Sequence, residues 1–177
     1  MNVFKLIASD FKVIKQKDPA AHNWLEILLC HWPFYAIMNY RFAHILWKWK
    51  IPILPRFICQ IAKFFTGVEI HPGAKIGKSF FIDHGTGIVI GETTIIGSDC
   101  SLYQGVTLGG TGKHTGKRHP TLADNVKVGA NAILLGPINI GSHVMVGGAT
   151  VVLADVPDNA TVVGNPGRVV KINGERV

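Results

Sequence analysis

Two histidines stand where the sequence could place chemistry, each next to a charged residue and close to several glycines. His84 follows Asp83 in the stretch IDHGTGIVIGE, and His119 follows Arg118 in a glycine-rich segment. A histidine titrates near neutral pH and can act as a general base, and a nearby carboxylate can fix its tautomer and support it. Glu69 lies upstream of His84 and is the candidate partner of a base at His84.

The composition of the chain changes between residues 66 and 67. All 20 glycines lie at or after Gly67, and all four tryptophans lie before it. Apolar residues before the boundary recur at helical spacing, which predicts helices over about 3–14, 34–49 and 56–65, with another that starts at Asp18-Pro19. We therefore divide the chain into a helical N-terminal domain, residues 1–66, and a second domain, residues 67–177.

The second domain repeats every six residues, with one aliphatic residue in each unit. The first series contains Ile70, Ile76 and Ile82; the next contains Ile90, Ile96, Leu102 and Leu108; the last contains Leu122, Val128, Leu134, Ile140, Val146 and Val152. Such a period is the signature of a parallel β-helix, in which three units form one triangular coil and the aliphatic residues stack inside. The predicted fold is mainly β, a left-handed parallel β-helix preceded by a short helical domain.

The repeat is interrupted twice, and both interruptions contain histidines. Two extra residues lie within 83–87, so a corner is expected to bulge there. Glu69 precedes His84 by close to one coil, which predicts that the two lie on adjacent rungs. The separation between Leu108 and Leu122 exceeds two repeat units by two, and most of 109–121 is expected to leave the coil as a loop. Loops on a rigid scaffold commonly carry functional sites.

The overall composition limits the class of protein. The mean hydropathy of +0.27 indicates either membrane contact or burial in an oligomer, and a stack of coils with flat apolar faces is expected to assemble side by side as a homotrimer. No apolar run approaches the ~20 residues of a membrane span, and charged residues interrupt any signal peptide, so we expect a cytoplasmic protein. The net charge of +7 fits either a solvated basic surface or a polyanionic ligand.

Five motifs together resemble serine acetyltransferase, a family of hexapeptide-repeat enzymes: VEIHPGAKIG, DHGTGIVIGE, GVTLGGTGK, KRHP and VVGNPGRVV. The resemblance covers residues 66–170 closely, and it extends loosely through KDPAA in the first domain. It implies transfer of the acetyl group of acetyl-CoA to the hydroxyl of L-serine, which gives O-acetylserine for cysteine biosynthesis. It also implies that no metal is required and that nucleic acid is not a partner.

The resemblance assigns roles to individual residues. It implies that His84 is the general base, that Glu69 stands where the family has its acidic partner, and that His119 belongs to the same catalytic set. Arg118 and His119 would act as cations for the serine carboxylate, and Asp83 and Asp18 as acidic contacts of the substrate. Glu69 is one methylene longer than the family's aspartate, which changes the geometry expected of the dyad.

The co-substrate would lie along the glycine-rich loop. The positions implied to line the acetyl-CoA groove are Gly110, Thr111 and Ala130, and Lys113 and Arg168 are candidates for contacts with the CoA phosphates, as is Lys117. Family members commonly have a longer helical domain that joins two trimers into a hexamer, so a hexamer is an alternative to the trimer. The family's tail binds O-acetylserine sulfhydrylase, and Val177 is the residue that would do so here.

Two other functions stay open on the residues alone. The first keeps the fold and changes the acceptor to a sugar or polysaccharide hydroxyl. The second is a zinc hydratase of the γ-carbonic-anhydrase type, with His84, His114 and His119 as the metal ligands. The combination of Arg118-His119 with the GGTGK loop favours serine acetylation over both.

Overall fold

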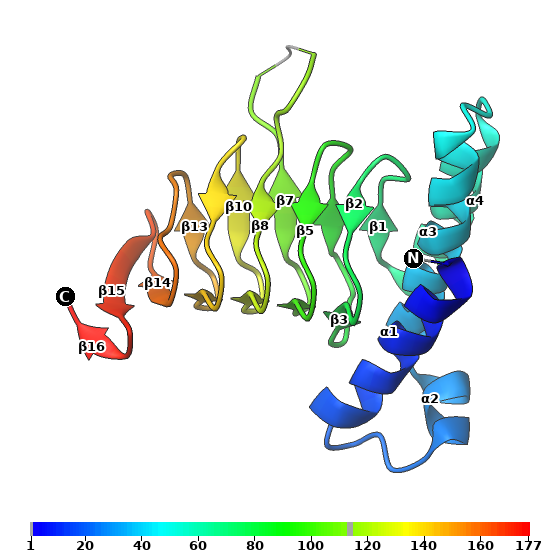
Figure 1. Ribbon diagram of the computed structural model, residues 1–177, viewed down its shortest axis with the longest axis horizontal. Helices are drawn as coiled ribbons and strands as arrows, with labels where there is room; N and C mark the ends of the chain where they lie inside the picture. Colours follow the sequence, from blue (N-terminus) through cyan, green and yellow to red (C-terminus); the bar gives the residue numbers. More distant parts are fainter. Residues whose placement is uncertain (1, 113–114) are drawn as a thin grey trace.

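The computed structural model describes residues 2–112 and 115–177. Four helices come first: α1 (Val3–Lys17), α2 (Trp24–Cys30), α3 (Trp32–Lys48) and α4 (Leu54–Thr66). They gather at one end of a stack of strands, and the C-terminus lies at the other end (Figure 1). No helix in the described part of the chain is long and apolar enough to cross a bilayer.

The second helix begins later than the sequence indicated. Asp18 ends α1 instead of starting α2, and its Oδ1 accepts from the Ala20 N–H at 2.8 Å in a short turn. The cap of α2 is Asn23, whose Oδ1 accepts from the Glu26 N–H at 2.9 Å. Both residues have side chains suited to capping a helix. The sequence therefore contains two candidate starts for α2, at Asp18 and at Asn23, and the structure uses the second.

Short strands follow Gly67 and form three sheets, and the chain passes from one sheet to the next along a triangular coil. The first sheet contains β1 (Glu69–Ile70), β4 (Val89–Ile90), β7 (Thr107–Gly109), β10 (Ile133–Leu135) and β13 (Val151–Val152). The second contains β2 (Lys75–Ile76), β5 (Ile95–Ile96), β8 (Thr121–Leu122) and β11 (Asn139–Ile140). The third contains β3 (Phe81–Ile82), β6 (Ser101–Leu102), β9 (Lys127–Val128), β12 (Met145–Val146), β14 (Ala160–Val163), β15 (Arg168–Ile172) and β16 (Glu175–Arg176).

Stacking is parallel until the last strands. Only β14–β15 and β15–β16 pair antiparallel in the described chain. We call the corner between the third and first sheets edge I, and the corner between the first and second sheets edge II. Residues 83–88 lie on edge I, and residues 91–94, 110–112 and 115–120 lie on edge II.

The strand register measures both interruptions. Val89 pairs with Thr107, which is the residue one regular coil later. Glu69 pairs with Val89, which lies one coil and two further positions along, and this confirms the small insertion on edge I. Ile95 pairs with Thr121, which lies one coil and eight further positions along, so the insertion on edge II is the larger one. The expectation of two repeat units between Leu108 and Leu122 was therefore wrong, because these residues lie on consecutive sides of one coil.

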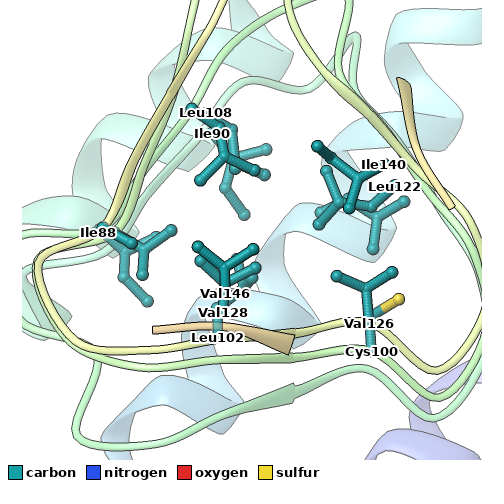
Figure 2. Close-up of a cluster of buried hydrophobic side chains, with 14 of the residues drawn as sticks. Ile88, Ile90, Cys100, Leu102, Leu108, Leu122, Val126, Val128, Ile140 and Val146 are labelled. Atoms are coloured by element: carbon teal, nitrogen blue, oxygen red, sulfur yellow. The ribbon is translucent and has the colours of Figure 1, made fainter. Parts of the chain in front are cut away.

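Aliphatic side chains fill the interior of the prism in columns. Figure 2 shows Ile90 stacked with Leu108, Leu122 with Ile140, and Leu102 with Val128 and Val146. All of these side chains are at most 3% exposed. Burial of each such side chain contributes roughly 1.5–3 kcal/mol, so the columns make a rigid support for the two edges.

A buried ion pair joins the helices to the prism. Arg41 on α3 donates from Nε to Asp10 Oδ2 on α1 at 2.9 Å, and its other nitrogens donate to the carbonyls of Ile76 and Gly77 at 2.6 Å. Asp10 Oδ1 accepts from the Phe80 N–H at 2.9 Å. Burial raises the pKa of Asp10, and the guanidinium of Arg41 opposes that shift.

We expect Asp10→Ala to lower the free energy of unfolding by about 3–5 kcal/mol, because it leaves a buried guanidinium without its carboxylate. Urea unfolding followed by circular dichroism measures this loss. Lys12→Ala is the matched control, since Lys12 is exposed on the same helix. A loss within about 0.5 kcal/mol, the range of surface substitutions, would show that the pair does not hold the helices in place.

Candidate active site

Edge I presents His84 to solvent from a tightly constrained turn. His84 has φ +57°, and its side chain is 75% exposed. Gly85 behind it has φ +85° and is packed so closely that a Cβ would lie 2.9 Å from side-chain carbons of Pro33 and Val68. His84 Nε2 lies 3.9 Å from Asp83 Oδ1. The inserted residues thus place an imidazole and a carboxylate together on the surface.

The helices bring a second carboxylate towards edge I. Asp18 Oδ2 lies 3.9 Å from His31 Nδ1, and the His31 ring stacks on Phe81 at a centroid distance of 6.0 Å. Burial lowers the pKa of His31, while the negative charges of Asp18 and Asp83 act to raise it. The His31 ring therefore lies within electrostatic range of both carboxylates. Asp18, which is far from Asp83 in the sequence, therefore approaches the His84 turn in the folded chain.

His31 is a residue that the sequence analysis did not single out. It sits between Asp18 and the turn of edge I, and its Nε2 is buried without a hydrogen-bond partner among residues 2–112 and 115–177. No spacing in the sequence indicates this position, because it depends on the packing of the residue between α2 and α3 against Phe81 of β3.

Glu69 does not contact His84 in this structure. Its carboxylate Oε2 lies 2.5 Å from Lys63 Nζ on the last turn of α4, and among the described ion pairs the carboxylate nearest His84 is that of Asp83. The expected Glu69–His84 pair is thus not formed. The physical reason is competition between two partners. Lys63 lies close to Glu69 in the sequence, and its ammonium forms an ion pair with the Glu69 carboxylate in place of His84.

Arg118 and His119 lie on edge II just before β8, at the base of the segment that leaves the prism between β7 and β8 (Figure 1). His119 is 8% exposed. Its Nδ1 lies 2.8 Å from Thr93 Oγ1 and accepts from the Thr93 N–H at 3.2 Å. Arg118 donates to Glu92 Oε2 at 2.5 Å. Gly91 makes room for the imidazole, since a Cβ there would lie 2.0 Å from the ring of His119.

The surroundings of Arg118 and His119 on edge II shift the pKa values of the cluster. Burial lowers the pKa of His119, and the positive charges of Arg118 and Lys117 lower it further. The hydrogen bond from Arg118 lowers the pKa of Glu92, which keeps that carboxylate ionised. At pH 7 His119 is therefore predominantly neutral, so Arg118 is the cation of the pair and His119 is a neutral hydrogen-bonding group.

The two clusters lie on different edges of the prism. The turn of His84 precedes β4 and the Glu92–Thr93 turn follows it, so a complete side of the first sheet lies between them. Five or six residues at ~3.3 Å each span roughly 15–20 Å. One chain does not bring His84 and His119 to the same substrate. Among the described residues no three His, Cys, Asp or Glu side chains converge as metal ligands would.

The positions assigned to the co-substrate are divided between the edges. Ala130 lies on edge I, where its carbonyl accepts from the Ala149 N–H at 2.8 Å, and the hydrogen bonds of this edge continue from Thr86 through Gln104. Gly110 and Thr111 are exposed on the loop of edge II, and Arg168 is exposed at the start of β15. Lys113 and His114 lie outside the described residues.

Comparisons with known proteins agree on one family. The chain is 56% identical over 175 residues to the serine acetyltransferase of Synechococcus elongatus, a match that covers 99% of this chain and 72% of that protein. The crystal structure of Neisseria gonorrhoeae serine acetyltransferase in complex with serine matches with a TM-score of 0.90 at 40% identity, over 94% of this chain and 68% of that one. A serine acetyltransferase in complex with CoA matches with a TM-score of 0.89 at 40% identity, over 95% of this chain and 69% of that one. No protein-family model matches the chain.

Proposed function

The chain belongs to the serine acetyltransferase family, and we propose that His84 acts as the general base of its reaction. The enzyme transfers the acetyl group of acetyl-CoA to the hydroxyl of L-serine and so supplies O-acetylserine for cysteine biosynthesis. The observation that carries the mechanism is the pair of clusters on neighbouring edges, an exposed imidazole beside a carboxylate on edge I and a fixed Arg118-His119 pair on edge II.

The chemical step is a direct attack on the thioester. Nε2 of His84 removes the proton of the serine hydroxyl as the oxygen attacks the thioester carbon. The C–O bond forms, the C–S bond breaks, and the CoA thiolate recovers the proton from the imidazolium of His84. A positioned base of this kind contributes about 10²–10⁴-fold to the rate. Glu69 would support the imidazole only after exchanging Lys63 for His84, and that dyad stays a prediction.

Serine is recognised by charge at both ends. The carboxylates of Asp18 and Asp83 near His84 suit its ammonium group, and the guanidinium of Arg118 suits its carboxylate. His119 adds a neutral N–H donor to the same carboxylate. Because each contact is charge-assisted or fixed by a second partner, the hydroxyl of serine is held next to His84.

Acetyl-CoA lies between the edges in this proposal. Backbone N–H groups around Gly110 and Thr111 suit the oxyanion that forms on the thioester oxygen. Ala130 lines the groove on edge I. Arg168 and Lys113 are the cations proposed to bind the phosphates of CoA.

The assembly that completes the site is a homotrimer. His84 and His119 cannot meet within one chain, whereas edge I of one prism can face edge II of its neighbour around a threefold axis. A hexamer of two trimers is the alternative, because α4 exposes a row of apolar side chains: Leu54, Phe57, Ile61, Phe64 and Phe65.

The remaining assignments are also proposals. The coil is left-handed, in keeping with corner residues that take positive φ without being glycine, such as Asp99, Asn125 and Asn131. The domain boundary lies between residues 66 and 67, and the enzyme works in the cytoplasm. Binding of O-acetylserine sulfhydrylase by the tail stays a prediction; the Val177 N–H here donates to Val170 O at 3.3 Å.

The proposal is tested by thiol release from acetyl-CoA with a panel of acceptors. We expect turnover with L-serine and much weaker turnover with the other acceptors, because sugars lack the two charged ends of serine and L-homoserine has an extra methylene that moves its hydroxyl away from His84. Reactions without acceptor give the background of hydrolysis. Thiol release with sugars and none with L-serine would contradict the proposal and indicate a sugar or polysaccharide hydroxyl as the acceptor.

A further inference from the structure

Thr93 contacts three consecutive residues on the returning limb of the edge II loop, Lys117, Arg118 and His119. Its Oγ1 accepts from the backbone N–H groups of Arg118 at 3.0 Å and His119 at 3.1 Å. Its carbonyl accepts from Lys117 Nζ at 2.8 Å. Its N–H and its hydroxyl both face Nδ1 of the His119 ring, at 3.2 and 2.8 Å. One threonine thus holds the backbone of the pair and one of its side chains.

These contacts determine where the protons lie. A threonine hydroxyl has one proton and two acceptor lone pairs. The two backbone N–H groups occupy both lone pairs of Thr93 Oγ1, so its own proton points to Nδ1 of His119. The Thr93 N–H also points at this nitrogen. Nδ1 therefore accepts, and in the neutral ring the proton sits on Nε2.

We propose that Thr93 is a positioning residue that holds His119 in the neutral tautomer with its proton on Nε2, aimed at the serine carboxylate. Nε2 is the ring nitrogen away from Thr93, and it lies between Gly91 and the start of the loop, since a Cβ on Gly91 would lie 2.0 Å from it and a Cβ on Gly110 3.2 Å from it. The inference rests on the proposed roles of Arg118 and His119 in binding serine. It adds that Thr93, from another turn of edge II, fixes the positions of Arg118 and His119 before serine binds.

The electrostatic surroundings of His119 agree with this assignment. Burial lowers the pKa of His119 most, Arg118, Lys117 and His71 lower it further, and Glu92 acts to raise it. The hydrogen bonds that Thr93 donates to Nδ1 also lower the pKa of His119, because a protonated Nδ1 could no longer accept them. Glu92 has a parallel part, since its carboxylate holds the guanidinium of Arg118.

The neighbouring residue provides a matched control. Thr94 is fully buried, and its hydroxyl has no hydrogen-bond partner within residues 2–112 and 115–177. Thr94→Val removes a hydroxyl one position away that orients nothing in the described structure. Thr93→Val is the same change of shape, and Thr93→Ser restores the hydroxyl without the methyl group.

The experiment reads the tautomer directly. Protein labelled with ¹⁵N-histidine gives ring nitrogen shifts that separate an unprotonated Nδ1 from a protonated one, and His119→Gln assigns the signals. In the wild type, Thr93→Ser and Thr94→Val, we expect His119 to show an unprotonated Nδ1 and a protonated Nε2. In Thr93→Val we expect a mixture of tautomers and a His119 pKa that moves up from its wild-type value.

Kinetics give the second readout. The KM for L-serine should rise by about 10–100-fold in Thr93→Val, the scale expected when buried groups lose their hydrogen-bond partner. The KM for acetyl-CoA should stay within about threefold, and Thr93→Ser should recover most of the loss. A single wild-type tautomer in Thr93→Val, or a rise in both KM values together, would overturn the inference. If His119→Gln leaves the KM for serine unchanged, the proposed role of His119 fails, and the ring shifts still decide whether Thr93 sets its tautomer.

Discussion

Replacing His84 with alanine is expected to lower kcat by about 10²–10⁴-fold, the contribution of a positioned general base. The serine hydroxyl is a poor nucleophile at neutral pH, and His84 is the solvent-exposed imidazole on the turn of edge I, whereas the nearby His31 ring is largely buried. The KM values should change little, because the proton is removed only as the bond forms. Thiol release at saturating L-serine and acetyl-CoA measures the effect.

The backbone of His84 calls for a specific control. His84 has φ +57°, and alanine is less tolerant of positive φ than histidine or asparagine. His143 is exposed in a turn of a later coil with φ +60°, so His143→Ala carries the same backbone change away from the site. His84→Asn removes the base and keeps a residue that tolerates this conformation. We expect His84→Asn to match His84→Ala and His143→Ala to match the wild type; a His84→Asn enzyme within threefold of wild type would exclude the base.

The interior of the prism was predictable because burial imposes a period. Each aliphatic residue that points inward must recur once per side, so Ile90, Leu108 and Leu134 could be placed from spacing alone, and their burial confirms it. The same reasoning located the edge I insertion, because the aliphatic register resumes two positions late.

The length of the edge II insertion was harder to predict, because no burial period applies to it. Residues that project into solvent have no packing period, and the separation between Leu108 and Leu122 fits one repeat unit plus eight positions as well as two units plus two. The strand register resolves this, since Ile96 pairs with Leu122. The identities of Arg118 and His119 were available from the motif, but Thr93 was not, because its importance depends on which coil the loop returns to.

The contacts on edge I show which side-chain pairings could not be predicted from the sequence. The spacing of Glu69 and His84 predicted neighbours on successive coils, but the ammonium of Lys63 on α4 binds the carboxylate first. His31 was unremarkable in the sequence and lies between Asp18 and the His84 turn. Both outcomes depend on how the helices dock on the prism, which a repeat pattern in the other domain does not contain.

Two inactive variants are expected to restore activity when they assemble together. If His84 of one subunit works with His119 of its neighbour, a trimer formed from His84→Asn and His119→Gln chains contains sites with both residues intact. Random assembly of equal amounts gives both intact residues at about one quarter of the sites, because each of the two contributing chains must be the right variant. We therefore expect co-expressed variants to reach about a quarter of wild-type activity.

The controls separate this result from leakage and from a site within one chain. Each variant purified alone should show only its own residual activity, and a mixture of preformed assemblies should equal their average, because subunits have not exchanged. Distinct affinity tags on the two chains isolate the mixed trimers. Activity of mixed trimers that equals the average of the single variants would place both histidines of each site in one subunit. That outcome would contradict the geometry, because the first sheet holds the two edges apart within every chain, and restoration therefore tests the fold and the mechanism at once.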